Sequence, residues 1–87
     1  MKREEVLQAL RKNRQETARY SVFGDDNHAA LDAMIRAVSQ EWDEDDVYEH
    51  YPVENYPNQN DAALSIIQAL PDILEGKEDL EDYLYPV

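Results

Sequence analysis

Apolar residues recur at intervals of three and four along residues 26–42, and this spacing constrains the fold more than any other feature of the chain. The members of this stripe are Ala30, Leu31, Met34, Ile35, Val38 and Trp42. Such spacing places apolar side chains on one face of a helix, and that face must be buried against a core. Glycine occurs only twice in 87 residues, and no segment alternates apolar and polar residues between hairpin turn signals. The sequence therefore predicts an all-α fold.

The segment before this stripe predicts a first helix over residues 3–20, followed by a break. Gly24 lies in the break, where it can adopt a positive φ. Asp25 or Asp26 can then accept hydrogen bonds from the first free amides of the second helix. The second helix is predicted to span residues 26–42.

The segment after residue 42 predicts two more helices joined by a loop. Asp43 caps a short third helix, which Pro52 ends. Two prolines and three asparagines in residues 52–60 indicate a surface loop. The fourth helix is expected to begin at Asn60 or Asp61.

Pro71 interrupts the apolar pattern of the fourth helix, because proline removes a backbone donor and clashes with the preceding turn. The helix either kinks there or ends, with Pro71 opening a separate turn. Gly76 is a predicted helix stop, and residues 77–84 predict a last short helix. The core is expected to include Leu10, Leu31, Met34, Ile35, Val38, Ile67 and Leu70. We expect residues 1–87 to form one domain, a small bundle of four to five helices.

The composition excludes several functional classes. The chain has no cysteine, which rules out disulfides, a thiol nucleophile and thiolate metal sites. It has no apolar run near the roughly 20 residues that a membrane span needs, and its charged start is unlike a signal peptide. We therefore expect a cytoplasmic protein that does not bind membranes.

Charge is distributed unevenly along the chain. Residues 1–19 carry six Lys and Arg against three Glu, whereas residues 20–87 carry two basic and 17 acidic side chains. The acidic part would repel phosphates, so direct binding to nucleic acid is not expected. The cations of the first helix are expected to lie against the protein's own carboxylates. The acidic surface either serves solubility or attracts a protein partner with a basic surface.

Residue patterns for catalysis or metal binding are scarce. His28 with Asp32, and Asp46 with His50, are spaced one helical turn apart, which is common by chance in an acidic chain. The run of residues 43–46 resembles part of a calcium loop but lacks its turn glycine and distal glutamate. Neither a nucleophile elbow nor a glycine-rich phosphate loop is present. We predict no enzyme activity, no metal site and no cofactor.

Aromatic and acidic residues gather around the third helix and the following loop. The candidate partner-binding residues are Asp43, Glu44, Asp45, Asp46, Tyr48, Glu49, Tyr51, Glu54 and Tyr56. One interpretation is that Trp42 and Tyr48 fill the core while the other rings cover it. The other is that Tyr51 and Tyr56 anchor a partner inside a rim of carboxylates. A second acidic strip near the C-terminus, residues 72–82, could with the first imitate the phosphate rows of a duplex.

Two resemblances bear on these patterns. Residues 23–33, Phe-Gly-Asp-Asp-Asn-His-Ala-Ala-Leu-Asp-Ala, and residues 42–49, Trp-Asp-Glu-Asp-Asp-Val-Tyr-Glu, resemble small acidic proteins carried by bacteria, phages and mobile elements. The architecture is also similar to the immunity proteins of nuclease bacteriocins, acidic four-helix proteins with a short tyrosine-bearing third helix. Tyr48, Tyr51 and Pro52 would occupy that helix. Glu49 and His50 separate the tyrosines, and the basic first helix departs from that pattern.

Two functional hypotheses follow. In the first, the protein is an acidic inhibitor or decoy of the anti-defence or immunity type, which occupies the basic surface of a nucleic-acid-handling protein. In the second, it is a structural or accessory module that dimerises or joins an assembly through an apolar helix face. Binding through carboxylates should weaken steeply with ionic strength, whereas an apolar interface should not.

Overall fold

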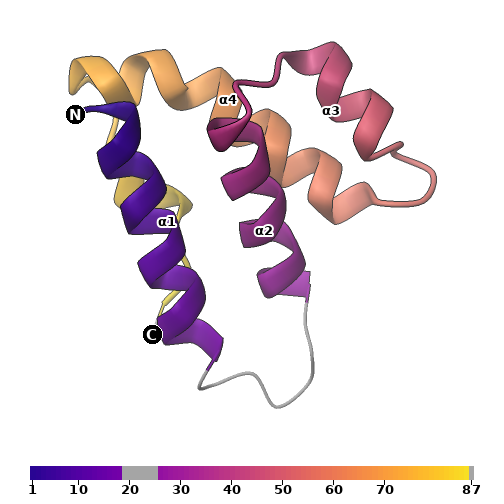
Figure 1. Cartoon of the computed structure of the whole chain (residues 1–87), viewed down its shortest axis with the longest axis horizontal. Helices are drawn as coiled ribbons and strands as arrows, with labels where there is room; N and C mark the ends of the chain where they lie inside the picture. The colour runs from indigo at the N-terminus through magenta and orange to yellow at the C-terminus, as the bar shows by residue number, and fades with distance from the viewer. Residues whose placement is uncertain (19–25, 87) are drawn as a thin grey trace.

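Helix α2 (Asp26–Ser39) lies at the centre of an all-α bundle. The computed structural model describes residues 1–18 and 26–86. Within them, α1 (Arg3–Ala18), α2, α3 (Glu44–His50) and α4 (Pro57–Glu75) are followed by a 3₁₀ turn, η1 (Leu80–Tyr83). Figure 1 shows α1 and α2 side by side, with α4 running across them and α3 at the far end. The largest interface joins α2 to α4, because both helices carry continuous apolar faces.

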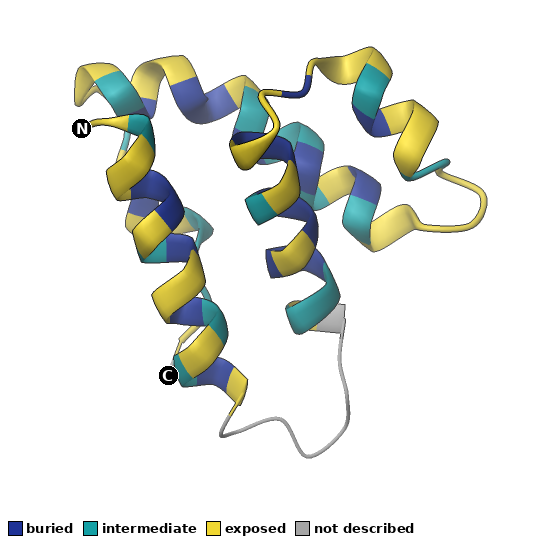
Figure 2. Ribbon diagram, in the orientation of Figure 1, coloured by how far each residue is buried: buried dark blue, intermediate teal, exposed yellow. Residues whose placement is uncertain are grey.

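The core confirms most of the residues expected from the apolar pattern. Leu10, Leu31 and Val38 are fully buried, and Met34 and Leu70 nearly so. Figure 2 shows that α1, α2 and α4 each carry several buried positions. Ile35 and Ile67 were expected in the core as well. They pack against it but remain partly exposed. The fully buried isoleucines are Ile66 and Ile73.

Helix α2 ends three residues earlier than predicted. Glu41 adopts a left-handed φ of 54°, and its N–H donates to the Val38 carbonyl while the Trp42 N–H donates to the Ala37 carbonyl. These two bonds form the Schellman motif that often closes a helix. Glycine usually occupies the left-handed position, so the presence of glutamate there hid the helix end from the sequence pattern.

Helix α4 begins at Pro57 rather than at Asn60 or Asp61. Proline is well suited to the first helical position, because its missing N–H would have no partner there. Asn60 does not cap the helix. It is buried, and its side-chain nitrogen donates to the Tyr51 carbonyl at 2.8 Å, which joins the start of α4 to the end of α3.

Pro71 lies inside α4, which continues to Glu75 as one helix. The alternative of a separate turn opening at Pro71 is therefore excluded. Pro71 itself is exposed, and the core contacts of Leu70 and Ile73 hold the helix on both sides of it. Gly76 ends the helix in the left-handed conformation as predicted, with φ of 80°. The last predicted helix is reduced to the four residues of η1.

The first predicted break lies outside the described residues. Residues 19–25 are not described, so the positive φ predicted for Gly24 and the cap predicted at Asp25 lie there, while Asp26, the alternative cap, is the first residue of α2. Among the described helices, none combines the length and the apolar composition that crossing a membrane would require.

Candidate functional site

A capping box positions α3, the helix that carries most of the candidate residues. The Asp43 carboxylate accepts a hydrogen bond from the Asp46 N–H at 2.9 Å, and the Asp46 carboxylate accepts one from the Asp43 N–H at 3.1 Å. This reciprocal pair satisfies amides that have no partner within the helix. Asp43 and Asp46 therefore have a structural role in addition to their charge.

The turn between α2 and α3 brings Trp42 back against the core. Its side chain is only 8% exposed, and its Nε1 donates to the Gln40 side chain at 3.2 Å. The His50 ring stacks on it, with ring centroids 4.3 Å apart and planes 20° apart. The His50 Nδ1 also lies 2.9 Å from the Asp46 carbonyl oxygen. These contacts give His50 a packing role at the end of α3.

A row of aromatic rings leads outward from Trp42. Tyr51 meets Trp42 edge to face with centroids 5.8 Å apart, and Tyr56 meets Tyr51 in the same way at 5.8 Å. The Arg36 guanidinium lies 5.1 Å from the Trp42 ring centre and 5.6 Å from that of Tyr51. Its Nη1 donates to the Tyr51 hydroxyl at 3.0 Å. Tyr51 is half-buried and is held by Arg36 of α2. Its ring therefore supports Tyr56 and is not itself free to contact a partner.

The exposed apolar side chains concentrate at this end of the molecule. Tyr48 is 49% exposed, Val53 47% and Tyr56 43%. Among the described residues, only Met1 is a further large apolar side chain of comparable exposure. The interpretation that Tyr48 fills the core is therefore wrong, while Trp42 does fill it. Val53 was not among the candidates, because a lone valine in a predicted loop has no helical spacing to mark it.

Exposed carboxylates lie on the same helix and loop as these side chains. Asp45 and Glu49 are exposed on α3, and Glu54 is exposed in the loop that follows. Tyr48 is one helical turn from Glu44 and adjacent on the helix surface to Asp45. Glu44 accepts a hydrogen bond from the Gln68 side chain of α4 at 3.0 Å. Figure 2 shows this helix and loop as mainly exposed, at the end of the bundle away from α1.

Helix α1, which carries most of the N-terminal cations, lies on the opposite side of α2 from α3 (Figure 1). Arg14 pairs with Asp32 of α2 at 3.1 Å, and Arg3 lies 3.9 Å from Glu41 while its Nη1 donates to the Val38 carbonyl. Lys12 pairs with Glu16 of its own helix at 3.7 Å. Among the described residues, Arg14 and Arg3 therefore reach from α1 to α2 or to the turn after it, whereas Lys12 pairs within α1. These exposed pairs each contribute about 0–1 kcal/mol.

The exposed side of α3 and the loop after it combine apolar area with negative charge. Tyr48, Val53 and Tyr56 offer apolar area, and the carboxylates around them offer charge. Among the side chains that the structure describes, no group of three His, Asp or Glu could hold a metal ion. Comparison with known proteins found no matching family model, no matching curated protein and no matching solved structure.

Proposed function

We propose that the protein is a small acidic binding module that acts in the cytoplasm as an inhibitor or decoy of a basic, nucleic-acid-handling protein. Inhibition of this kind fits an anti-defence or immunity factor of a phage or mobile element. One observation carries the proposal: of the four exposed large apolar side chains in the part of the chain that the structure describes, three lie within residues 48–56, on a segment with exposed carboxylates. We call this the acidic aromatic surface, and its members are Asp45, Tyr48, Glu49, Val53, Glu54 and Tyr56.

The surface has the parts that protein interfaces need. When a partner binds, exposed tyrosines become buried over a large area at little entropic cost, and they often contribute most of the binding energy. Carboxylates around them speed the encounter with a basic partner. Tyr56 packs against Tyr51, which Arg36 in turn holds by a hydrogen bond, so Tyr56 loses less freedom on binding than an unsupported ring would. The second acidic strip begins at the C-terminal end of α4, which lies at the opposite end of the long axis from α3 (Figure 1). We therefore base the proposal on the α3 side alone.

The first experiment identifies the partner. Tagged wild-type protein and a Tyr48→Ala/Tyr56→Ala variant are used in parallel to capture proteins from the native host, which mass spectrometry then identifies. We expect a basic nucleic-acid-handling protein that the wild type captures and the variant does not. Equal capture by both would remove the acidic aromatic surface from consideration.

The second experiment separates anchors from charges by surface-binding kinetics with that partner. Tyr48→Ala or Tyr56→Ala should speed dissociation, at a cost of about 2 kcal/mol if the ring is a hot spot. Asp45→Asn, Glu49→Gln and Glu54→Gln together should slow association and flatten its salt dependence. The matched control removes three charges from the C-terminal strip through Asp72→Asn, Glu75→Gln and Glu81→Gln. If the control variant slows association equally, the net negative charge of the whole protein attracts the partner, and the acidic aromatic surface has no specific role.

A specific observation also favours the alternative of an apolar interface. Ile67, Pro71 and Leu74 of α4 border a hollow of about 280 Å³ whose other side includes Trp42. This hollow could receive an apolar side chain from a second copy or from an assembly partner. Analytical ultracentrifugation at low and high salt tests this function. A dimer that persists in high salt and is lost in Ile67→Asp would support the alternative.

A further inference from the structure

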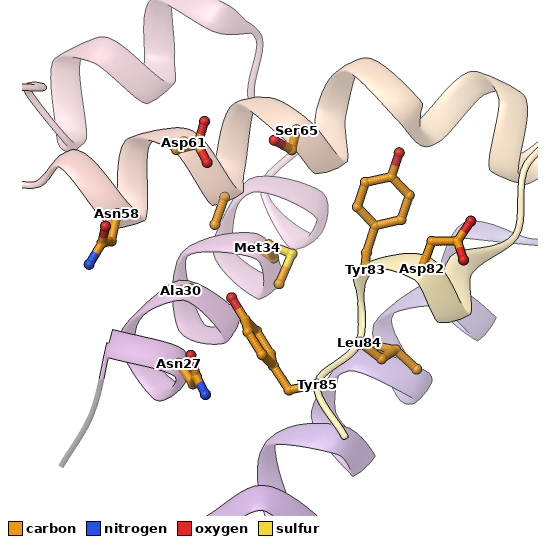
Figure 3. Close-up of a pocket in the computed structure, with 11 residues that line it drawn as sticks. Asn27, Ala30, Met34, Asn58, Asp61, Ser65, Asp82, Tyr83, Leu84 and Tyr85 are labelled. Carbon is orange, nitrogen blue, oxygen red and sulfur yellow. The ribbon is translucent and has the colours of Figure 1, made fainter. Parts of the chain in front are cut away.

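A second hollow lies between α2, α4 and the C-terminal segment, far from the hollow at Trp42. Its volume is about 410 Å³. The nearly buried Ala30 and Met34 of α2 form its floor. Figure 3 shows Tyr83 and Tyr85 projecting from the C-terminal segment on one side, and Asp61 and Ser65 of α4 on the other. The hollow therefore combines a thioether and two aromatic rings with polar groups at its rim.

The aromatic wall is held in place by contacts outside the hollow. The Asn13 side chain of α1 donates to the Tyr85 carbonyl at 2.9 Å and accepts from the Tyr85 N–H at 3.0 Å. The Tyr83 hydroxyl donates to the Glu78 carboxylate. Both tyrosine rings are half-buried in these positions. A ligand would not have to order the wall, so little of its binding energy would be lost to that step.

The charge of the lining has one sign. Asp61 and Asp82 are among the residues that border the hollow, and within residues 1–18 and 26–86 neither lysine nor arginine borders it. Burial, with the Asp61 charge as a second cause, raises the pKa of Tyr85. Asp61 and Tyr85 border the same hollow (Figure 3). An anion would be repelled from this site, whereas a cation would be attracted.

We propose that this hollow binds an alkylated ammonium ion, with the cation against the rings of Tyr83 and Tyr85 and its charge balanced by Asp61. Aromatic faces attract cations, and they favour alkylated ammonium groups because these shed water readily. Met34 adds a polarisable surface for the alkyl groups. The cation comes either from a small free amine or from a methylated lysine side chain. The proposal is independent of the acidic aromatic surface around α3.

The test measures binding of two probes of equal shape that differ only in charge. Choline carries a trimethylammonium group, and 3,3-dimethylbutan-1-ol replaces it with a neutral tert-butyl group. Titration of ¹⁵N-labelled protein should give saturable shifts for choline, with the largest changes at Met34, Asp61, Tyr83 and Tyr85. The alcohol should bind at least about fivefold more weakly, because it lacks the cation. Equal binding of both probes, or no saturable binding of choline, would overturn the proposal.

Variants assign the effect to the named groups. Tyr85→Leu removes a ring, and Asp61→Asn removes the charge; each should weaken choline binding about fivefold. The matched control Glu81→Gln removes one charge from η1 outside the hollow and should leave affinity unchanged. An equal loss of choline affinity in Glu81→Gln would reject the site, because it would show that the overall negative charge of the protein attracts the cation. A final titration with Nα-acetyl-trimethyllysine methylamide identifies the source, since the tighter of the two ammonium probes indicates a free amine or a lysine side chain.

Discussion

The side chain of Asn13 forms two hydrogen bonds with the main chain of Tyr85, 72 residues further along the chain. Asn13 is only 7% exposed, so these bonds form away from water. The main-chain carbonyl of Asn13 accepts a hydrogen bond from the Thr17 hydroxyl at 2.8 Å. This bond satisfies Thr17, the other buried polar side chain of α1. One amide thus fixes the C-terminal segment against the first helix.

Loss of the Asn13 amide should destabilise the fold. Asn13→Ala leaves the N–H and carbonyl of Tyr85 without their partner, and we expect a cost of about 1–3 kcal/mol in the free energy of unfolding. Gln15→Ala, at an exposed site on the same helix, should change stability by less than about 0.5 kcal/mol. Urea denaturation followed by circular dichroism measures both. Equal stability of the two variants would show that the Asn13 bonds contribute nothing.

Two neighbouring isoleucines should differ in their contribution to stability. Ile66 is fully buried and Ile67 is partly exposed. Ile66→Ala should cost about 2–5 kcal/mol, because it leaves a cavity in the core. Ile67→Ala should cost less, because part of its side chain already contacts water. Thermal and urea unfolding of the two variants checks the order, and a larger loss for Ile67→Ala would contradict the packing described here.

Glu41 should be a site where glycine stabilises the protein. Its φ of 54° is the only left-handed value among the described non-glycine residues, and glycine adopts that conformation without steric cost. Glu41 contributes only a long contact to Arg3, at 3.9 Å. We expect Glu41→Gly to raise the free energy of unfolding by about 1 kcal/mol. Glu41→Gln, which keeps the side-chain bulk, controls for the lost charge and should give no such gain.

Variants of Asp43 should show whether the capping box stabilises α3 through its hydrogen bonds or through its charge. Asp43→Ala removes the acceptor and should cost about 1 kcal/mol. Asp43→Asn removes the charge but retains an acceptor, and asparagine is also a good N-cap residue. Its cost should therefore be smaller. Asp45→Ala, at an exposed site of the same turn, is the matched control and should have little effect. Equal losses in all three variants would mean that charge near the helix start matters and the cap does not.

The free energy of unfolding should fall at alkaline pH because of Tyr83. The hydrogen bond to Glu78 and, secondarily, burial raise the pKa of Tyr83 from 10.0 to about 12. The folded state therefore holds this proton more tightly than the unfolded state. Its stabilising effect is complete below pH 10 and is lost as the pH rises towards 12.

The comparison of wild type with Tyr83→Phe isolates this effect, since other titrating groups are common to both. The wild type should be more stable at pH 8, and the difference should shrink between pH 10 and 12. Glu78→Gln keeps an acceptor but removes the charge, so its loss of stability above pH 10 should be smaller and should be complete at a lower pH than in the wild type. A wild-type advantage that stays constant over this range would contradict the assignment.

Most helix positions could be predicted because their signals are local. The apolar spacing of residues 30–38 and the left-handed glycine at Gly76 depend on neighbours within a few residues. The end of α2 could not be predicted, because Glu41 takes a conformation that its residue type does not indicate. The start of α4 was missed for a related reason. Asn60 has the sequence signature of a cap, but its amide bonds to a distant carbonyl instead.

The candidate site shows the same division. The sequence located the acidic and aromatic residues around the third helix, since composition alone reveals such a cluster. It could not distinguish Tyr48 and Tyr56, which face solvent, from Tyr51, which Arg36 holds against Trp42. It also gave no sign that Asn13 and Tyr85 meet. By itself, the sequence determined the helical class, the core stripe of α2 and the uneven charge, because helix formation and net charge depend on local spacing and composition. Only the tertiary structure decided which rings are exposed and which distant polar groups pair, because burial and long-range hydrogen bonds arise only when the helices pack together.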